Sequence, residues 1–182
     1  MKAVLLCLFP LLFCVSSNAQ DMASLKQRVD KVYAHLVTNE SDSLVKYAHP
    51  SVFKLLSEKE FIDLHRSIEK MDEGTVSLIN IPPNFKINEI KKIEQSSYCI
   101  LYYDEASKIT FTEPIHSSYE KILLDVFKKR FNAEKVVFNS TTNTFLVKRR
   151  MKLIAIADNH TNYEWTFFPI IEDQKIREQL GL

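Results

Sequence analysis

The sequence predicts a single α+β domain in which N-terminal helices are followed by antiparallel strands. Two observations carry this prediction. Apolar residues recur at helical spacing as far as Gly74 and then at a period of two, which is typical of strands. One further helical stripe, near residues 119–131, interrupts the strands. Because the helices are grouped first and the strands then follow as hairpins, the pattern favours α+β over an alternating α/β architecture.

The N-terminal stretch has the features of a cleavable signal peptide. A single lysine precedes an apolar run, and Ser17 and Ala19 supply the small residues that a signal peptidase needs. We expect residues 1–19 to be removed between Ala19 and Gln20, which leaves residues 20–182 as one domain. The apolar run is about 13 residues long, shorter than the ~20 residues of a membrane-spanning helix, so no stable membrane anchor is expected.

Charge and cysteine content narrow the class of protein further. The chain has 24 Lys plus Arg and 23 Asp plus Glu, and the loss of Lys2 with the signal leaves 23 of each, so the domain is formally neutral. A neutral domain offers no net field for nucleic acid, and none is expected as a partner. Two of the three cysteines lie in the signal, which leaves Cys99 without a partner for an intramolecular disulfide. We expect a soluble exported protein of the bacterial periplasm or the extracellular space.

Three helices are predicted before Gly74. The first follows the apolar spacing over residues 25–37, and a second short one, near residues 44–48, ends before a proline. The third begins with Ser57 and Glu60 in the spacing of a capping box and ends at Gly74, which suits a helix terminator. A fourth, long helix lies inside the strand region. Its predicted apolar stripe consists of Tyr119, Ile122, Leu123, Val126, Phe127 and Phe131.

The strand pattern divides at polar turns. Strands are predicted at residues 75–81, 85–94, 97–104, 108–113, 135–139, 143–148, 150–158 and 163–170. The acidic segment 104–107 is interpreted as a turn between two of these strands. A short closing helix is expected to contain Ile176 and Leu180.

Short motifs in the second half of the chain carry a family resemblance. They are residues 127–131, 136–138, 141–144 and 164–168, followed by the closing helix. From about Leu44 onwards the chain resembles a group of uncharacterised exported bacterial proteins that are similar to the nuclear transport factor 2-like, or cystatin-like, superfamily. The resemblance implies a strongly bent antiparallel sheet wrapped around a long helix, with a cone-shaped pocket. It implies a shape and no particular reaction, because that superfamily has no universal catalytic residue.

One position departs from the pattern expected at the end of the fourth helix. Asn132 stands where a glycine would end the helix after Phe131. Asparagine adopts the left-handed conformation most readily after glycine, so the helix is still expected to end there.

The sequence excludes several kinds of site. Gly74 and Gly181 are the only glycines, so a phosphate-binding loop, a dinucleotide-binding fingerprint and a serine-hydrolase elbow cannot be built. None of the five histidines stands at a metal-ligand spacing, and the one cysteine of the domain cannot form a thiolate zinc site. No cofactor and no metal are therefore expected, and the residues favour no class of enzyme.

The candidate site residues are aromatic side chains on alternating strand positions and one histidine. They are Tyr98, Tyr102, Phe111, Trp165, Phe167 and His65. The aromatic set could line a pocket for an apolar ligand or form ordinary sheet core, which we favour. His65 could act as a base beside Asp104, although a histidine on an apolar helix face is more often a core residue. Trp165, the only tryptophan, is predicted to lie in the core, on one strand face with Tyr163 and Phe167.

The remaining polar features have simpler interpretations. Cys99 is expected to be buried and inert, and the basic clusters 128–130 and 148–150 are expected at solvated edges. Most carboxylates beside strands are expected to face outwards or to lie in turns. Residues 42–44, Asp-Ser-Leu, resemble a tripeptide used for O-glycosylation in the periplasm, which makes Ser43 a candidate acceptor.

The leading functional hypothesis is a non-enzymatic exported module that binds a small molecule or another envelope protein. The first alternative is an isomerase-like or lyase-like enzyme with an acid or histidine base in a cone-shaped pocket. The second is a partner-inhibiting or immunity-type protein. A homodimer is compatible with each of these hypotheses.

Overall fold

The computed structural model describes residues 9–67, 70–71 and 73–169, with side chains for residues 21–63 and 73–168. The helices are α1 (Phe9–Val37), α2 (Ser41–Leu44), α3 (Glu58–Ser67) and α4 (Ser117–Arg130). The strands are β1 (Lys70–Met71), β2 (Gly74–Ile79), β3 (Lys86–Ile87), β4 (Lys91–Ile93), β5 (Ser96–Phe111), β6 (Lys135–Asn139), β7 (Thr144–Ala157) and β8 (Thr166–Pro169). The predicted α+β class is confirmed. The predicted closing helix lies outside the described residues.

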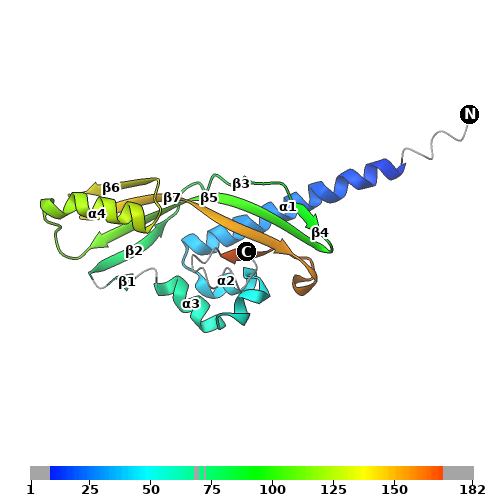
Figure 1. The fold of residues 1–182 in the computed structure, drawn as a ribbon, viewed down its shortest axis with the longest axis horizontal. Coiled ribbons are helices and arrows are strands. Elements are labelled where there is room, and N and C mark those ends of the chain that lie inside the picture. The colour runs from blue at the N-terminus through cyan, green and yellow to red at the C-terminus, as the bar shows by residue number, and fades with distance from the viewer. Residues whose placement is uncertain (1–8, 68–69, 72, 170–182) are drawn as a thin grey trace, which may run out of the picture.

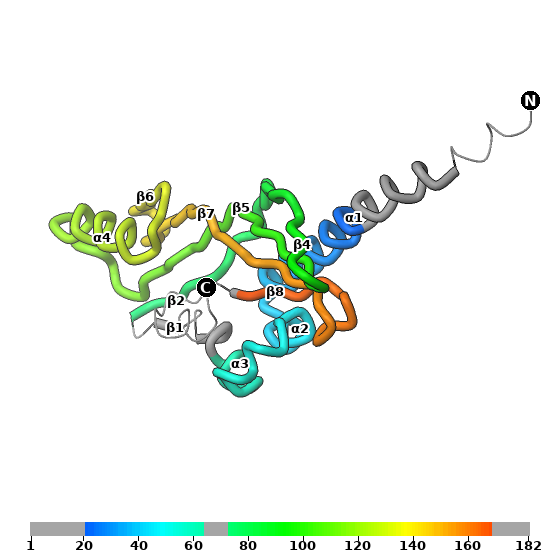
Figure 2. Tube along the Cα trace, turned by 45° about the vertical axis from the view of Figure 1, so that its right-hand side comes forward, coloured from blue at the N-terminus to red at the C-terminus, as the bar shows by residue number. Residues whose placement is uncertain are grey.

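All eight strands belong to one antiparallel sheet. Its main order is β1-β2-β5-β7-β6, with β3 and β4 paired to β5 and with β8 paired to β7. In Figure 1 and Figure 2, α1, α2 and α3 gather at one end of the sheet, whereas α4 and β6 occupy the other end. The sheet therefore carries a helical layer at each end, and the long strands β5 and β7 join the two.

β5 and β7 pair without interruption over fourteen positions, from Ser97 opposite Ala157 to Thr110 opposite Thr144. We call this pair of strands the β5–β7 ribbon. The predicted turn at residues 104–107 is wrong, because these residues lie inside the ribbon. The division of the partner strand between residues 148 and 150 is wrong for the same reason. The acidic residues stay in the strand because they stand opposite arginines, and opposite charges on paired positions stabilise a ladder.

One face of the ribbon supports two separate hydrophobic cores. Cys99, Leu101 and Ile109 are alternate positions of β5 and therefore lie on one face. Phe145 of β7 stands directly opposite Ile109 and lies on the same face. The proximal core joins Cys99 and Leu101 to α1, α3 and β8, and includes Leu25, Phe61, Trp165 and Phe167. The distal core joins Ile109 and Phe145 to α4, and includes Val76, Phe127, Ala133 and Val147. The centre of this face lies between the two cores.

Fewer apolar residues of α4 contact the sheet than its sequence predicts. Leu123, Leu124 and Phe127 contact the distal core. The predicted stripe also included Tyr119, Ile122 and Val126, but these are 60%, 56% and 44% exposed. That part of the prediction is wrong, because one helix against one sheet buries a single strip of side chains. The helix ends as expected: Asn132 adopts a left-handed φ of 46°.

The capping box at the start of α3 is confirmed, whereas the predicted end of this helix is wrong. The Ser57 N–H donates to Glu60 Oε2 at 2.7 Å, and the Glu60 N–H donates to Ser57 Oγ at 3.2 Å. The helix ends at Ser67, and Gly74 begins β2 instead of terminating a helix. Gly74 stands opposite Phe111 in the ladder, at a point where the neighbouring backbone approaches closely.

Three other predicted elements differ in extent. The strand expected at residues 85–94 is divided into the short strands β3 and β4. The strand expected at residues 163–170 is reduced to β8, because Tyr163 adopts a left-handed φ of 61° and is 57% exposed. The helix α1 begins at Phe9 and runs through the predicted cleavage point. Within the part of the chain that the structure describes, no helix is long and apolar enough to cross a membrane.

Replacing Gly74 with alanine tests the close approach of β2 to β5. A Cβ atom at this position would lie 2.3 Å from the carbonyl oxygen of Thr110, so the two strands must move apart. We expect Gly74→Ala to lower the free energy of unfolding by about 1–3 kcal/mol, measured by urea denaturation. Thr75→Ala, on the next and exposed position, is the control and should change it by less than about 0.5 kcal/mol. Equal effects of the two substitutions would contradict this account.

Candidate functional site

A pocket of about 280 Å³ lies over the centre of the ribbon face, beside the proximal core. Its walls come from the C-terminal end of α1, from α2 and α3, and from β2, β5, β7 and β8. Most of the lining is apolar and includes Val32, Leu36, Leu44, Phe61, Leu153 and Phe167. The pocket forms here because the helices α1–α3 and α4 cover the two ends of the ribbon and leave its middle open.

Among the polar residues of the lining is an ion pair between Glu105 on β5 and Arg149 on β7. The two residues stand directly opposite each other in the ladder. Arg149 Nε and Nη2 both donate to Glu105 Oε1, at 2.7 Å and 2.6 Å. The side chains are only 9% and 24% exposed, and the guanidinium also lies 5.8 Å from the centre of the Phe131 ring. A half-buried pair with two hydrogen bonds compensates much of the cost of removing both charges from water.

Tyr103 lies beside this pair and adds a hydroxyl to the pocket lining. Its ring meets that of Tyr33 edge to face, with the ring centres 5.8 Å apart. Tyr33 in turn donates its hydroxyl to the carbonyl oxygen of Ile81 at 2.8 Å. Burial, together with the neighbouring Glu105 charge, raises the pKa of Tyr103 far above its ordinary value. The Tyr103 hydroxyl therefore stays protonated and uncharged throughout the physiological range.

The structure separates the predicted aromatic set. Phe167 lines the pocket, whereas Phe111 packs at the edge of the distal core. Tyr98 and Tyr102 are half-buried, and strand alternation places them on the opposite face of β5 from Tyr103. The side chain of His65 lies outside the described residues. The described residues therefore do not bring the predicted set together in one pocket.

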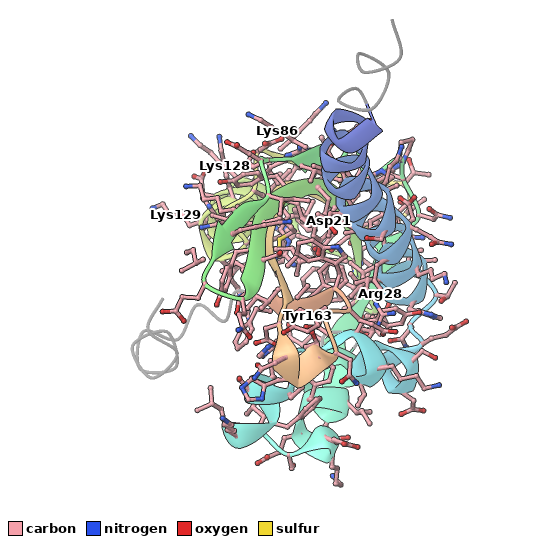
Figure 3. All side chains as sticks on the ribbon, turned by 90° about the vertical axis from the view of Figure 1, so that its right-hand side faces the viewer. Asp21, Arg28, Lys86, Lys128, Lys129 and Tyr163 are labelled. Carbon is pink, nitrogen blue, oxygen red and sulfur yellow. The ribbon has the colours of Figure 1, made fainter. Side chains whose placement is uncertain are left out.

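Trp165 lies in the proximal core, as predicted, and is 4% exposed. Its indole N–H lies 3.2 Å from both the carbonyl oxygen of Asp21 and the hydroxyl of Ser24. Figure 3 shows Asp21 and Arg28 along α1, with Tyr163 in the turn that precedes β8. Arg28 extends this contact through an ion pair with Glu164 at 2.9 Å. The indole thus fixes the middle of α1 against the segment that leads into β8.

The acid proposed as a partner for His65 does not belong to the pocket. Asp104 lies on the opposite face of β5 from Glu105 and is 8% exposed. A hydrogen bond from the Asn84 amide, together with contacts to Arg150 and Lys148, holds the pKa of Asp104 below its ordinary value. The carboxylate is thus engaged by three donors and unsuited to act as a base.

The basic cluster 148–150 was expected at a solvated edge, and this prediction is wrong. β7 is an interior strand, and Lys148, Arg149 and Arg150 all form ion pairs with carboxylates of β5. The cluster 128–130 is exposed as expected, and Figure 3 shows Lys128 and Lys129 at the periphery of the molecule.

Two further sequence interpretations have different outcomes. Cys99 is buried, as predicted, and burial raises the pKa of its thiol, which disfavours the reactive thiolate. Ser43 is half-buried within α2, and its glycosylation stays a prediction.

A buried pair of His49 and Asp158, which the sequence did not reveal, is not part of the pocket lining. His49 Nε2 is 3.3 Å from Asp158 Oδ2, and His49 Nδ1 accepts a hydrogen bond from the Ser51 N–H at 3.2 Å. The Asp158 carboxylate also caps the turn at residues 159–161. Both partners are occupied in connecting the helical layer to the β7–β8 turn, so the pair is structural. Within the described residues no group of His, Cys, Asp and Glu side chains is arranged to hold a metal ion.

The main residues that sequence reasoning missed are Glu105 and Arg149. The available signal was the Asp-Glu dipeptide in one apolar strand and the Arg-Arg dipeptide in another. Recognising them as partners requires the register of two strands that are about 45 residues apart in the chain. No protein-family model and no curated protein sequence matches the chain.

Truncating Trp165 tests its structural role. We expect Trp165→Ala to lower the free energy of unfolding by about 3–5 kcal/mol, because a fully buried indole and its hydrogen bonds are lost. Trp165→Phe keeps most of the apolar contact and should lower the free energy of unfolding by clearly less. Urea denaturation measures both, and the native protein should show blue-shifted tryptophan emission that iodide quenches poorly. An unchanged denaturation midpoint in the alanine variant would overturn the core assignment.

The raised pKa values predict how stability depends on alkaline pH. The pKa values of Tyr103, Tyr33 and Cys99 are all raised in the folded state, so the folded protein binds more protons than the unfolded chain above pH ~9. Stability is therefore complete below that pH and falls as the pH rises through the folded pKa values. We expect Tyr103→Phe to make the fall between pH ~9 and ~11 shallower, as measured by urea denaturation at several pH values. A fall as steep as that of the unmodified protein would contradict the assignment to Tyr103.

Proposed function

We propose that the protein is a binding module whose pocket holds a small, mostly apolar molecule. The observation that carries this proposal is an apolar pocket of about 280 Å³ with one buried ion pair in its wall. Small-molecule sites combine a concave apolar lining with a few fixed polar groups, and their volumes begin at about 300 Å³. Since a water molecule occupies about 30 Å³ in the liquid and a methylene group is of similar size, the pocket suits a ligand of about ten heavy atoms.

The same pocket gives less support to an isomerase or lyase. A catalytic carboxylate or imidazole must be free to exchange a proton with its substrate, without being committed to another charged group. Glu105 is the carboxylate in the pocket lining, and its Oε1 already accepts two hydrogen bonds from Arg149. The Tyr103 hydroxyl is held protonated. We therefore propose binding without turnover.

Export and family membership belong to the same proposal. We propose that residues 1–19 direct the chain out of the cytoplasm and that residues 20–182 act in the bacterial periplasm or outside the cell. The order of helices before strands and the helix α4 beside a long antiparallel sheet support the resemblance to the nuclear transport factor 2-like superfamily. We propose that the pocket corresponds to the cone-shaped pocket of that superfamily.

A fluorescent probe of matching size tests the proposal. 2-Naphthol should bind the pocket and lose the emission of its ionised excited state, because the pocket removes it from water. Leu36→Trp places a larger side chain in the pocket wall and should weaken this binding by at least about tenfold. Ile122→Trp, on the exposed side of α4, is the matched control and should leave binding unchanged. Absence of 2-naphthol binding, or equal loss in both variants, would overturn the proposal.

A further inference from the structure

The ion pair in the pocket wall bears on the head group of the ligand, an inference that rests on the proposed function. Arg149 Nε and Nη2 both use the same oxygen of Glu105, Oε1. Among the described residues, neither Glu105 Oε2 nor Arg149 Nη1 has a hydrogen-bond partner. Three of the five N–H groups of Arg149 and the second oxygen of Glu105 thus stay available, so the pair offers both a donor and an acceptor.

The pair carries no net charge, which determines what it can recognise. A carboxylate that approached Arg149 would also approach the Glu105 carboxylate, and an ammonium group would meet the Arg149 cation in the same way. Opposite contributions of similar size then nearly cancel. To bind either ion tightly, the pair would have to open and leave one half-buried charge without its partner, which is unfavourable.

The remaining charge along the pocket wall does not alter this balance. Lys152 on β7 is exposed and stands opposite Tyr102 in the ladder. Strand alternation places its side chain on the opposite face from Met151 and Leu153. The neighbouring Tyr103 hydroxyl is uncharged. The polar part of the lining therefore has no net charge besides that of Lys152: it consists of the neutral pair, the Tyr103 hydroxyl and uncharged side chains such as Thr38, Asn39, Ser41 and Ser77.

We infer that the ligand has an uncharged head group that both donates and accepts hydrogen bonds, such as a hydroxyl or a primary amide. The hydroxyl or amide hydrogen is donated to Glu105 Oε2, and its oxygen accepts from an unused N–H group of Arg149. The apolar body lies against Leu36, Leu44, Phe61 and Phe167. The ligand class is thus a small hydrophobic alcohol or amide.

Four probes with one naphthalene body and different head groups test this inference. They are 2-naphthol, 2-naphthamide, 2-naphthoate and 2-naphthylmethylammonium, with naphthalene as the reference. We expect the alcohol and the amide to bind at least about tenfold more tightly than naphthalene and than either ion. Binding is measured by probe fluorescence with the intact protein.

Substitution of each partner should change the selectivity in opposite directions. Glu105→Gln leaves the Arg149 cation alone and should make 2-naphthoate the preferred probe by about tenfold. Arg149→Gln leaves the carboxylate and should favour 2-naphthylmethylammonium. The double variant Glu105→Gln/Arg149→Gln is neutral again and should restore the preference for the alcohol and the amide. Tryptophan emission reports whether each variant is folded. If a single variant does not fold, the probe preference of the double variant still tests the inference.

The two proposals fail in different ways. If no naphthalene probe binds, the proposed function and the head-group inference are both overturned. If all five compounds bind with equal affinity, the pocket binds small apolar molecules but the ion pair does not select the head group. A preference of the unmodified protein for either ion would overturn the inference alone.

Discussion

The continuous pairing of β5 with β7 depends on the neutralisation of four charges at its centre. Asp104 and Glu105 on one strand stand opposite Arg150 and Arg149 on the other. Leaving any of these charges unpaired inside a ladder would cost more than the strand gains there. Because neighbouring positions point to opposite faces, each face receives one of the two carboxylates with the arginine opposite it. The pair on the core-bearing face joins the two hydrophobic cores and also supplies a polar part of the pocket lining.

Local features of the fold could be predicted from the sequence because their causes are local. The change of period at Gly74, the capping box at Ser57 and the left-handed residue Asn132 each depend on a few neighbouring residues. The continuity of the ribbon could not be predicted in this way. From its sequence alone the acidic segment 104–107 resembles a turn. The arginines that neutralise it lie about 45 residues further along the chain, so local sequence does not show the pairing. The exposed side of α4 was missed for a similar reason, since only the partner surface decides which apolar residues are buried.

The site was less predictable than the fold. Alternation places Tyr103 and Tyr102 on opposite faces of β5, but it does not say which face receives helices. Two aromatic candidates were therefore assigned to the face that the pocket does not occupy. Trp165 was predicted correctly because a large apolar residue next to a strand is buried for most of the arrangements that the sheet could adopt.

The contact of Trp165 with Asp21 and Ser24 of α1 also constrains the order of folding. The indole and its two acceptors, Asp21 and Ser24, are separated by 144 and 141 residues. The helix α4 and the hairpin of β6 and β7 can form while the chain is incomplete, whereas the contact of α1 with Trp165 needs nearly the whole chain. Such late, long-range closure is slow, because the loop entropy is lost before the contact forms. The part of α1 that Trp165 covers therefore stays exposed until the chain is almost finished.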